Sequence, residues 1–245
     1  MDPWHRWLES ASFPPRSRLY LFDNSGDPAF SARLRDCAIA LSECGNFERA
    51  HLHIRRNPAP VPPRHNPERH WNVADAYNSA LFASGKNEAF VFLLVDDTIP
   101  PPDCLPKLAA AFAELETAGE RPGAISGSYE SATNRGFLVA GRSMLGWEKR
   151  VRIDELETND IIRVGMAGAG CLLIRGDLFW DFFPIRGESM GGVLGPDSYI
   201  CAEVHRRGYS VWLHGGVICD HLSARRPAES DPPPENPAAG GQAGA

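Results

Sequence analysis

Seven consecutive apolar residues at 89–95 end abruptly at Asp96, Asp97 and a proline-rich turn. An uninterrupted apolar run of this length is typical of a strand that is buried on both faces, as in the middle of a parallel sheet. Ligands of open α/β sheets bind at the carboxyl ends of strands. The pattern therefore predicts a central strand whose end carries a functional site.

Apolar residues elsewhere in the chain follow helical and strand-like patterns in turn. Phe30, Leu34, Ala38 and Leu41 recur at helical spacing and predict an amphipathic helix. The predicted strands are 18–22, 51–54, 123–128, 136–140, 168–175, 209–213 and 217–219. The predicted helices are 28–43, 73–83, a segment after Asp103, and 196–207. This alternation predicts an α/β fold, with a mainly parallel central sheet and helices on both of its faces.

Three segments are predicted along the chain. Residues 1–15 contain two tryptophans and predict a helical extension that packs on the domain or contacts a membrane. A single domain is predicted at 16–224, whereas 225–245 is rich in Pro, Gly and Ala and is predicted to be disordered. Inside the domain, the proline-rich loop at 55–70 is interpreted either as a binding loop for a polyanion or as a solvated basic loop.

Charge and cysteine content narrow the class of protein. The net charge of −6 gives no reason to expect nucleic acid as a partner. The six cysteines include no C-x-x-C pair and are interpreted as free thiols in a reducing compartment. No apolar run approaches the roughly 20 residues of a membrane helix, and no signal peptide is recognised. The sequence predicts a cytoplasmic protein without a transmembrane segment, with peripheral membrane contact as an alternative.

The two adjacent carboxylates of Asp96 and Asp97 are costly to hold close together unless a positive charge lies between them. A divalent cation that carries a diphosphate would supply this charge, because such ions take oxygen ligands and keep substrate phosphates in their shell. The alternative is that both aspartates cap the following turn and helix.

Four segments occur in an order that resembles the family-2 glycosyltransferases of the GT-A fold. They are LLVDDTIPPPDCL at 93–105, GAGCLLIRGDLF at 168–179, GPDSYICAEVHRRGYSVW at 195–212 and CDHL at 219–222. The family has a buried strand with a D-x-D turn, then G-x-x-x-L-I-R-R, then G-E-D-x-D-x-C-x-R-x-x-x-x-G-Y-x-V, and then a late histidine. The resemblance covers roughly residues 16–222. It implies a GT-A-like fold that acts on a nucleotide sugar.

The resemblance also implies a metal site. In such enzymes the D-x-D carboxylates hold Mn²⁺ or Mg²⁺ on the diphosphate of the donor, where the ion neutralises charge on the leaving group. Asp97 corresponds to the metal-binding aspartate, Asp96 takes the middle position beside the donor, and Val95 replaces the first aspartate. His221 corresponds to the histidine that completes the metal shell; an ordinary surface or core histidine is the alternative.

A general base is implied at Asp197, which matches the aspartate that deprotonates the acceptor hydroxyl in inverting members. At the start of a helix, backbone N–H groups would keep this carboxylate ionised. Pro196 replaces the acid that usually precedes it. A proline in the first helical position followed by a capping aspartate is the competing structural interpretation.

Further residues are implied around the donor and acceptor. Asp23, in FDNS, resembles the VDNSS segment near the nucleotide base, with a helix cap as the alternative. Asn78, in ADAYNSA, resembles a helix that lines the donor site. Gly165, Gly168 and Gly170 are interpreted as glycines that let a substrate approach the backbone, or that relieve crowding where a strand begins. Trp147 and Trp180 are candidates for sugar stacking or for core packing.

The sequence thus predicts a metal-dependent inverting glycosyltransferase. It would move a sugar from a nucleotide-diphosphate donor to a hydroxyl of a glycan, a lipid-linked acceptor or another acceptor. The alternative is a catalytically silent GT-A-like domain that binds a nucleotide sugar or a partner protein. A nucleotidyltransferase that acts on a sugar phosphate shares the metal chemistry, but its usual Gly-rich signature and lysine are not seen in the first 50 residues. The family's first strand is not visible before Arg18, so that strand is either absent or replaced by another element.

Overall fold

The computed structural model describes residues 3–54, 67–83, 88–143, 146–182, 184–186 and 195–222. The predicted disordered tail lies outside these residues, as does most of the proline-rich loop. Among the described helices, none is long and apolar enough to cross a membrane. The cysteines are free thiols, and all but Cys44 are buried.

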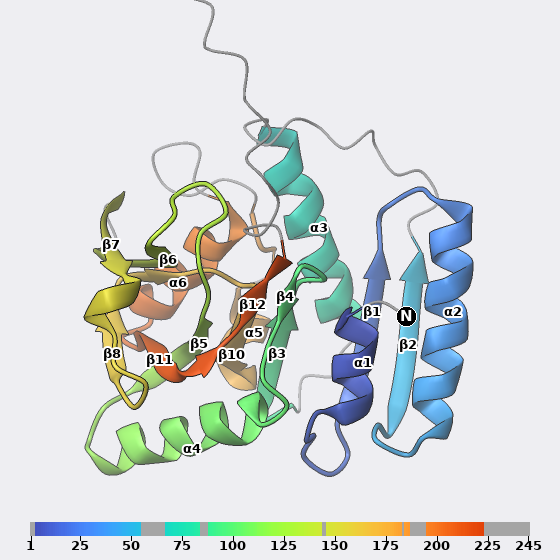
Figure 1. Cartoon of the computed structure of the whole chain (residues 1–245), viewed down its shortest axis with the longest axis horizontal. Helices are drawn as coiled ribbons and strands as arrows, with labels where there is room; N and C mark the ends of the chain where they lie inside the picture. Colours follow the sequence, from blue (N-terminus) through green and yellow to red (C-terminus); the bar gives the residue numbers. More distant parts are fainter. Residues whose placement is uncertain are drawn as a thin grey trace, which may run out of the picture.

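The central sheet has the strand order β3-β10-β5-β11-β8 (Figure 1). Its strands are β3 (Phe90–Leu94), β10 (Cys171–Arg175), β5 (Pro122–Ser128), β11 (Ser210–Ile218) and β8 (Ile161–Val164). Only the β5–β11 pair is parallel, and the other three neighbouring pairs are antiparallel. The predicted mainly parallel sheet is therefore wrong. An uninterrupted apolar run indicates that a strand is buried on both faces of the sheet, as β10 is, but it does not indicate the direction of that strand.

The position predicted for 89–95 is also wrong. Strand β3 pairs with β10 and stands at the end of the sheet order, so it is an edge strand of the described sheet rather than a central one. Phe90 is 41% exposed, and only Leu93 of this strand is fully buried. The carboxyl end of the strand nevertheless carries Asp96 and Asp97, as predicted.

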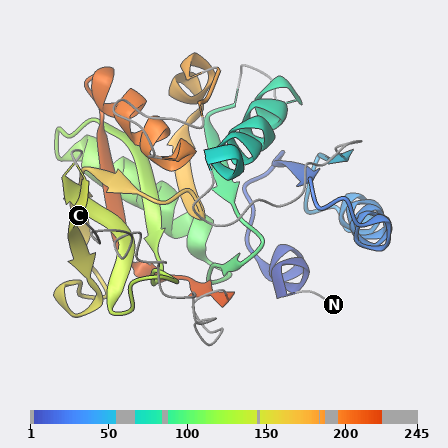
Figure 2. The same cartoon turned by 90° about the horizontal axis from the view of Figure 1, so that it is seen from above.

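A second, two-stranded sheet stands beside the central one (Figure 2). It pairs β1 (Arg18–Asp23) and β2 (Arg49–Ile54) in parallel. Helix α2 (Pro28–Glu43) joins the two strands and has the predicted bounds, because Asp27 caps its first turn by accepting a hydrogen bond from the Ala29 N–H at 2.8 Å. The described residues before β1 form helix α1 (Pro3–Ser10) and a turn-rich segment, with no strand among them.

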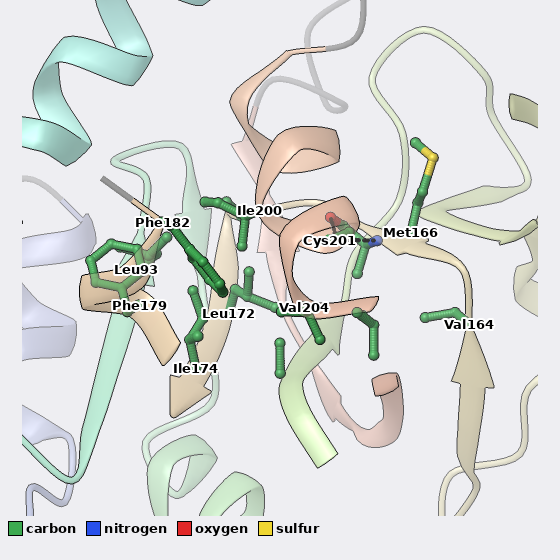
Figure 3. Close-up of a cluster of buried hydrophobic side chains, with 14 of the residues drawn as sticks. Leu93, Val164, Met166, Leu172, Ile174, Phe179, Phe182, Ile200, Cys201 and Val204 are labelled. Atoms are coloured by element: carbon green, nitrogen blue, oxygen red, sulfur yellow. Dashed lines mark hydrogen bonds between the residues drawn. The ribbon is translucent and has the colours of Figure 1, made fainter. Parts of the chain in front are cut away.

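Helices cover both faces of the central sheet, as predicted. On one face, α5 (Gly176–Asp181) and α6 (Pro196–Arg206) pack over Leu172 and Ile174 (Figure 3). Helix α3 (Pro67–Ala83) contributes buried residues to the same cluster and contacts α6. On the other, α4 (Cys104–Thr117) and α1 pack over Cys171 and Leu173. Successive residues of β10 therefore enter opposite cores, which explains why its sequence is apolar without a break.

Several short elements complete the fold. A three-stranded sheet consists of β6 (Phe137–Ser143), β7 (Gly146–Arg152) and β9 (Met166–Ala167), and the 3-10 helix η1 (Ile153–Glu155) follows β7. A two-stranded ladder joins β4 (Thr98–Ile99) and β12 (Asp220–His221). This ladder connects the end of the β3 segment to the end of the β11 segment.

Candidate functional site

The β4–β12 ladder brings Asp97 and His221 together across 124 positions of sequence. In this ladder His221 pairs with Thr98, and the Leu222 N–H donates to the backbone oxygen of Asp97 at 2.7 Å. The side chains meet as a result, with His221 Nε2 3.4 Å from Asp97 Oδ2. Two residues that were predicted to share a metal ion therefore lie side by side at the carboxyl end of β3.

The ring of His221 is held in one orientation. Its Nδ1 lies 2.6 Å from the backbone oxygen of Glu130. A carbonyl oxygen can only accept, so the Nδ1 N–H donates to it, and Nε2 is the ring atom that faces Asp97. Histidine ligands of metals usually donate their other ring N–H in this way, which fixes the tautomer.

A hard divalent cation fits this pair. Mg²⁺ and similar ions are commonly held by one or two carboxylates while substrate phosphates and water complete the shell. Within the described part of the chain, no group of three or more His, Cys, Asp and Glu side chains is arranged to hold a metal by itself. Asp97 and His221 thus supply one carboxylate and one imidazole as possible ligands.

The alternative that Asp96 and Asp97 cap the next helix does not agree with the start of α4. Its N-cap position is occupied by Asp103, and the side chain of Asp103 forms an ion pair with Lys107 at 2.9 Å. Asp96 lies in the turn between β3 and β4 and is exposed. Asp97 is half-buried, and its backbone oxygen accepts the hydrogen bond from Leu222, which directly follows β12.

Asp197 lies in the first turn of α6, one residue after Pro196, with Gly195 at the N-cap position. The backbone N–H of Ala169 donates a hydrogen bond to its carboxylate. Burial raises the pKa of the Asp197 carboxyl above its ordinary value, against the opposing effects of this N–H and of His70. The expectation that backbone N–H groups keep Asp197 ionised is therefore wrong in its direction, because burial outweighs them. A carboxylate with a raised pKa is nevertheless a stronger base than an exposed aspartate, as a proton acceptor requires.

Tyr129 links the two parts of the site and was missed at the sequence level. Its ring meets the His221 ring edge-on, with 5.4 Å between the centroids. Its hydroxyl accepts a hydrogen bond from the Gly170 N–H at 2.9 Å. Burial and, secondarily, the charge of Asp197 raise the pKa of Tyr129. Tyr129 directly follows the predicted strand 123–128, and this position at a strand end was the signal that could have identified it.

The glycines before β10 accommodate this tyrosine. A β-carbon at Gly170 would come within 2.8 Å of the Tyr129 phenol ring and 2.9 Å of Thr98 Oγ1. The Thr98 hydroxyl is fully buried. Of the two interpretations of these glycines, the structure supports relief of crowding, because the space that a side chain would need is filled by protein.

Asn78 and Asp23 both have protein partners. The Asn78 amide donates to the Ile185 oxygen at 2.9 Å and accepts from the Ile185 N–H at 2.8 Å. Asp23 is buried, and Oδ1 accepts from the Ser25 N–H at 2.9 Å and from the Ser25 hydroxyl at 2.7 Å. The Ser31 hydroxyl donates to the other carboxylate oxygen. Their donor-binding roles stay predictions; Trp180 packs partly buried against the core.

Replacement of Asp23 by Asn is expected to destabilise the fold in a pH-dependent way. Burial opposes ionisation of Asp23, but the hydrogen bonds from Ser31 and Ser25 outweigh it and lower the pKa. A lowered pKa stabilises the fold above the unfolded-state pKa, and this stabilisation disappears as pH falls through the folded-state pKa. Urea unfolding should show a loss of about 1–3 kcal/mol at pH 7 for Asp23→Asn, and a smaller loss below about pH 3.8. A pH-independent difference would contradict this account.

Comparison with known proteins identifies the fold of the chain but shows no family for it. No protein-family model matches the sequence, and no curated protein matches it. GalNAc-T7, solved with UDP, GalNAc and Mn²⁺, superposes with a TM-score of 0.55 at 13% identity, over 84% of this chain and 37% of that chain. A197 from STIV gives 0.48 at 17% identity, over 83% of this chain and 84% of that one. Apo UDP-glucose pyrophosphorylase gives 0.46 at 4% identity, over 91% and 83%.

The match to GalNAc-T7 shows that the chain has a GT-A-like fold. This chain spans about a third of the length of that protein, so the activity of the whole protein is not transferred with the fold. The expected GT-A-like fold is confirmed, whereas the resemblance to family-2 glycosyltransferases stays a prediction.

Proposed function

We propose that this protein is a metal-dependent inverting glycosyltransferase that uses a nucleotide-diphosphate sugar as donor. The observation that carries the proposal is the Asp97–His221 pair, in which His221 Nε2 lies 3.4 Å from Asp97 Oδ2 at the carboxyl end of β3. The GT-A-like fold supports it. UDP-sugars with Mn²⁺ are the first donors to test, because the GalNAc-T7 structure contains UDP, GalNAc and Mn²⁺.

Asp97 and His221 would hold Mn²⁺ or Mg²⁺ against the donor diphosphate, with Asp96 beside it. The bound ion would supply Lewis-acid stabilisation of the leaving diphosphate. Asp197 would accept the proton of the acceptor hydroxyl while the acceptor oxygen bonds to the anomeric carbon and the bond from that carbon to the diphosphate oxygen breaks. Attack from the side opposite the leaving group inverts the anomeric configuration.

A catalytically silent GT-A-like domain is the second candidate. It is favoured by Val95 and Pro196, which stand where the family has acids, and by the helix that precedes β1 in the described residues. Such a domain would bind a nucleotide sugar or a partner protein through the same fold.

Turnover separates the two candidates. Purified protein would be incubated with a panel of nucleotide sugars and Mn²⁺, and release of nucleoside diphosphate would be followed with and without hydroxyl acceptors. The transferase is expected to release diphosphate from one donor, to need the cation, and to form a product of inverted anomeric configuration. Binding of a donor without release of diphosphate under any of these conditions would favour the silent domain.

A further inference from the structure

A cavity of about 390 Å³ lies against His221 on the side formed by the ends of β5 and β11, by β6 and by η1. Its volume is within the range of small-molecule sites. His221 belongs both to this cavity and to the candidate metal site, so a molecule bound here would lie next to the ion and the donor diphosphate.

Part of the cavity lining is aliphatic, from Leu138, Leu156, Ile153 and Ile218. Ile218 is 65% exposed and Ile153 is 43% exposed, although both are large apolar side chains. Scattered exposed apolar residues are normal on a protein surface, but two that line one cavity together with buried Leu138 give that cavity apolar surface for a ligand.

The charged part of the lining is mainly acidic. It consists of Glu130 and Asp220, together with one guanidinium from Arg135. The Gly136 N–H donates to Glu130 Oε1 at 2.9 Å and so fixes the Glu130 side chain. A phosphate group would meet two carboxylates against one cation, which is unfavourable, whereas a neutral hydroxyl can donate hydrogen bonds to these acceptors.

The rings that line the cavity do not offer an open face for a sugar. They belong to Tyr129 and His221 among the described residues. Tyr129 is buried and its hydroxyl is used by Gly170, while His221 is held between Glu130 and Asp97. The remaining surface suits an alkyl or aryl group better than a polyhydroxylated ring.

We propose that this cavity binds the apolar body of the acceptor, so that the substrate is an amphiphile with a hydroxyl group beside an alkyl or aryl portion. The inference that the bound molecule is the acceptor rests on the proposed transferase function. The cavity and its preference for an apolar group can be measured without donor or metal.

The experiment compares binding of octyl β-glucoside and methyl β-glucoside, below the micelle-forming concentration of the octyl compound, by isothermal titration without nucleotide or Mn²⁺. The two probes share a head group and differ only in the apolar tail. Octyl glucoside is expected to bind at one site, at least about tenfold more tightly than methyl glucoside. Ile218→Ser, at an exposed position that the fold does not need, should remove most of that difference.

Ile39→Ser is the matched control, since Ile39 is 52% exposed on α2 and borders a shallower hollow away from His221. It should leave the octyl preference unchanged. Equal binding of the two glucosides, or equal weakening by both variants, would overturn the proposal. If octyl glucoside binds in a manner that depends on Ile218 but no nucleotide stabilises the protein, the cavity remains an amphiphile site and the transferase proposal is rejected. If a nucleotide stabilises the protein but octyl glucoside shows no preference, the cavity proposal alone is rejected.

Discussion

Asp197→Asn is expected to lower the rate of sugar transfer by a factor of about 10²–10⁴, the usual contribution of a positioned base. The amide keeps the shape of the side chain but cannot take the proton of the acceptor hydroxyl. Donor binding should be unchanged, because Asp197 lies at the start of α6 rather than with Asp97 and His221 on the β4–β12 ladder. The measurement is initial rate of transfer together with the dissociation constant of the donor.

The stability of Asp197→Asn provides a second measurement, because stability should be kept or increased while the transfer rate falls. The pKa of Asp197 is raised by burial, so the folded state favours the protonated form and the charged form costs stability at neutral pH. Asp197→Asn should therefore unfold at the same or a higher urea concentration than wild type at pH 7. Asp177→Asn, in the first turn of α5, is the control and should retain transfer. A variant that loses donor binding together with transfer would contradict the base assignment.

Asp97→Ala and His221→Ala are each expected to weaken cation-dependent donor binding by about 100-fold or more. Loss of a residue that only supports a metal ligand commonly costs 10–100-fold, and these two would be ligands themselves. Titration of a nucleotide sugar in the presence and absence of Mn²⁺ measures the effect. The variants should resemble each other, since either change leaves a single protein ligand.

Asp103→Ala is the control for this pair, because Asp103 is an exposed carboxylate six residues along the same segment and pairs with Lys107. It should keep the Mn²⁺-dependent affinity. Donor binding that does not depend on Mn²⁺ in wild type, or that survives in both alanine variants, would show that the donor is held elsewhere.

Local signals predicted α2 and α6 well, whereas the helix predicted at 73–83 begins six residues earlier, at Pro67, within the segment predicted as a proline-rich loop. Asp27 and Pro28 mark the start of α2, and the periodic apolar residues fix its extent, so its bounds agree with the structure. Helix α6 agrees to within one residue at its end. Pairing between strands depends on contacts that are distant in sequence, and there the sequence was a weaker guide. The apolar run of β3 was predicted to lie centrally, but the chain places β10 on one side of it and no described strand on the other.

In the candidate site too, local motifs could be predicted from the sequence but long-range pairing could not. The order of motifs singled out Asp97, Asp197 and His221, whose surroundings are built by the fold as described above. The two-residue strands β4 and β12 are too short to leave a periodic pattern, so the ladder that aligns Asp97 with His221 could not be predicted. Tyr129 was missed because a single tyrosine after a strand resembles ordinary core packing.

Thermal unfolding of the wild-type protein with each nucleoside diphosphate, with and without Mn²⁺, tests the central claim that Asp97 and His221 form a cation–diphosphate site. A ligand at 100 times its dissociation constant adds about 2.7 kcal/mol of stability, or roughly 5–10 °C for a domain of this size. The account predicts such a shift for one nucleotide, only when Mn²⁺ or Mg²⁺ is present. A shift of the same size without any divalent cation, or no shift with any nucleotide, would contradict it.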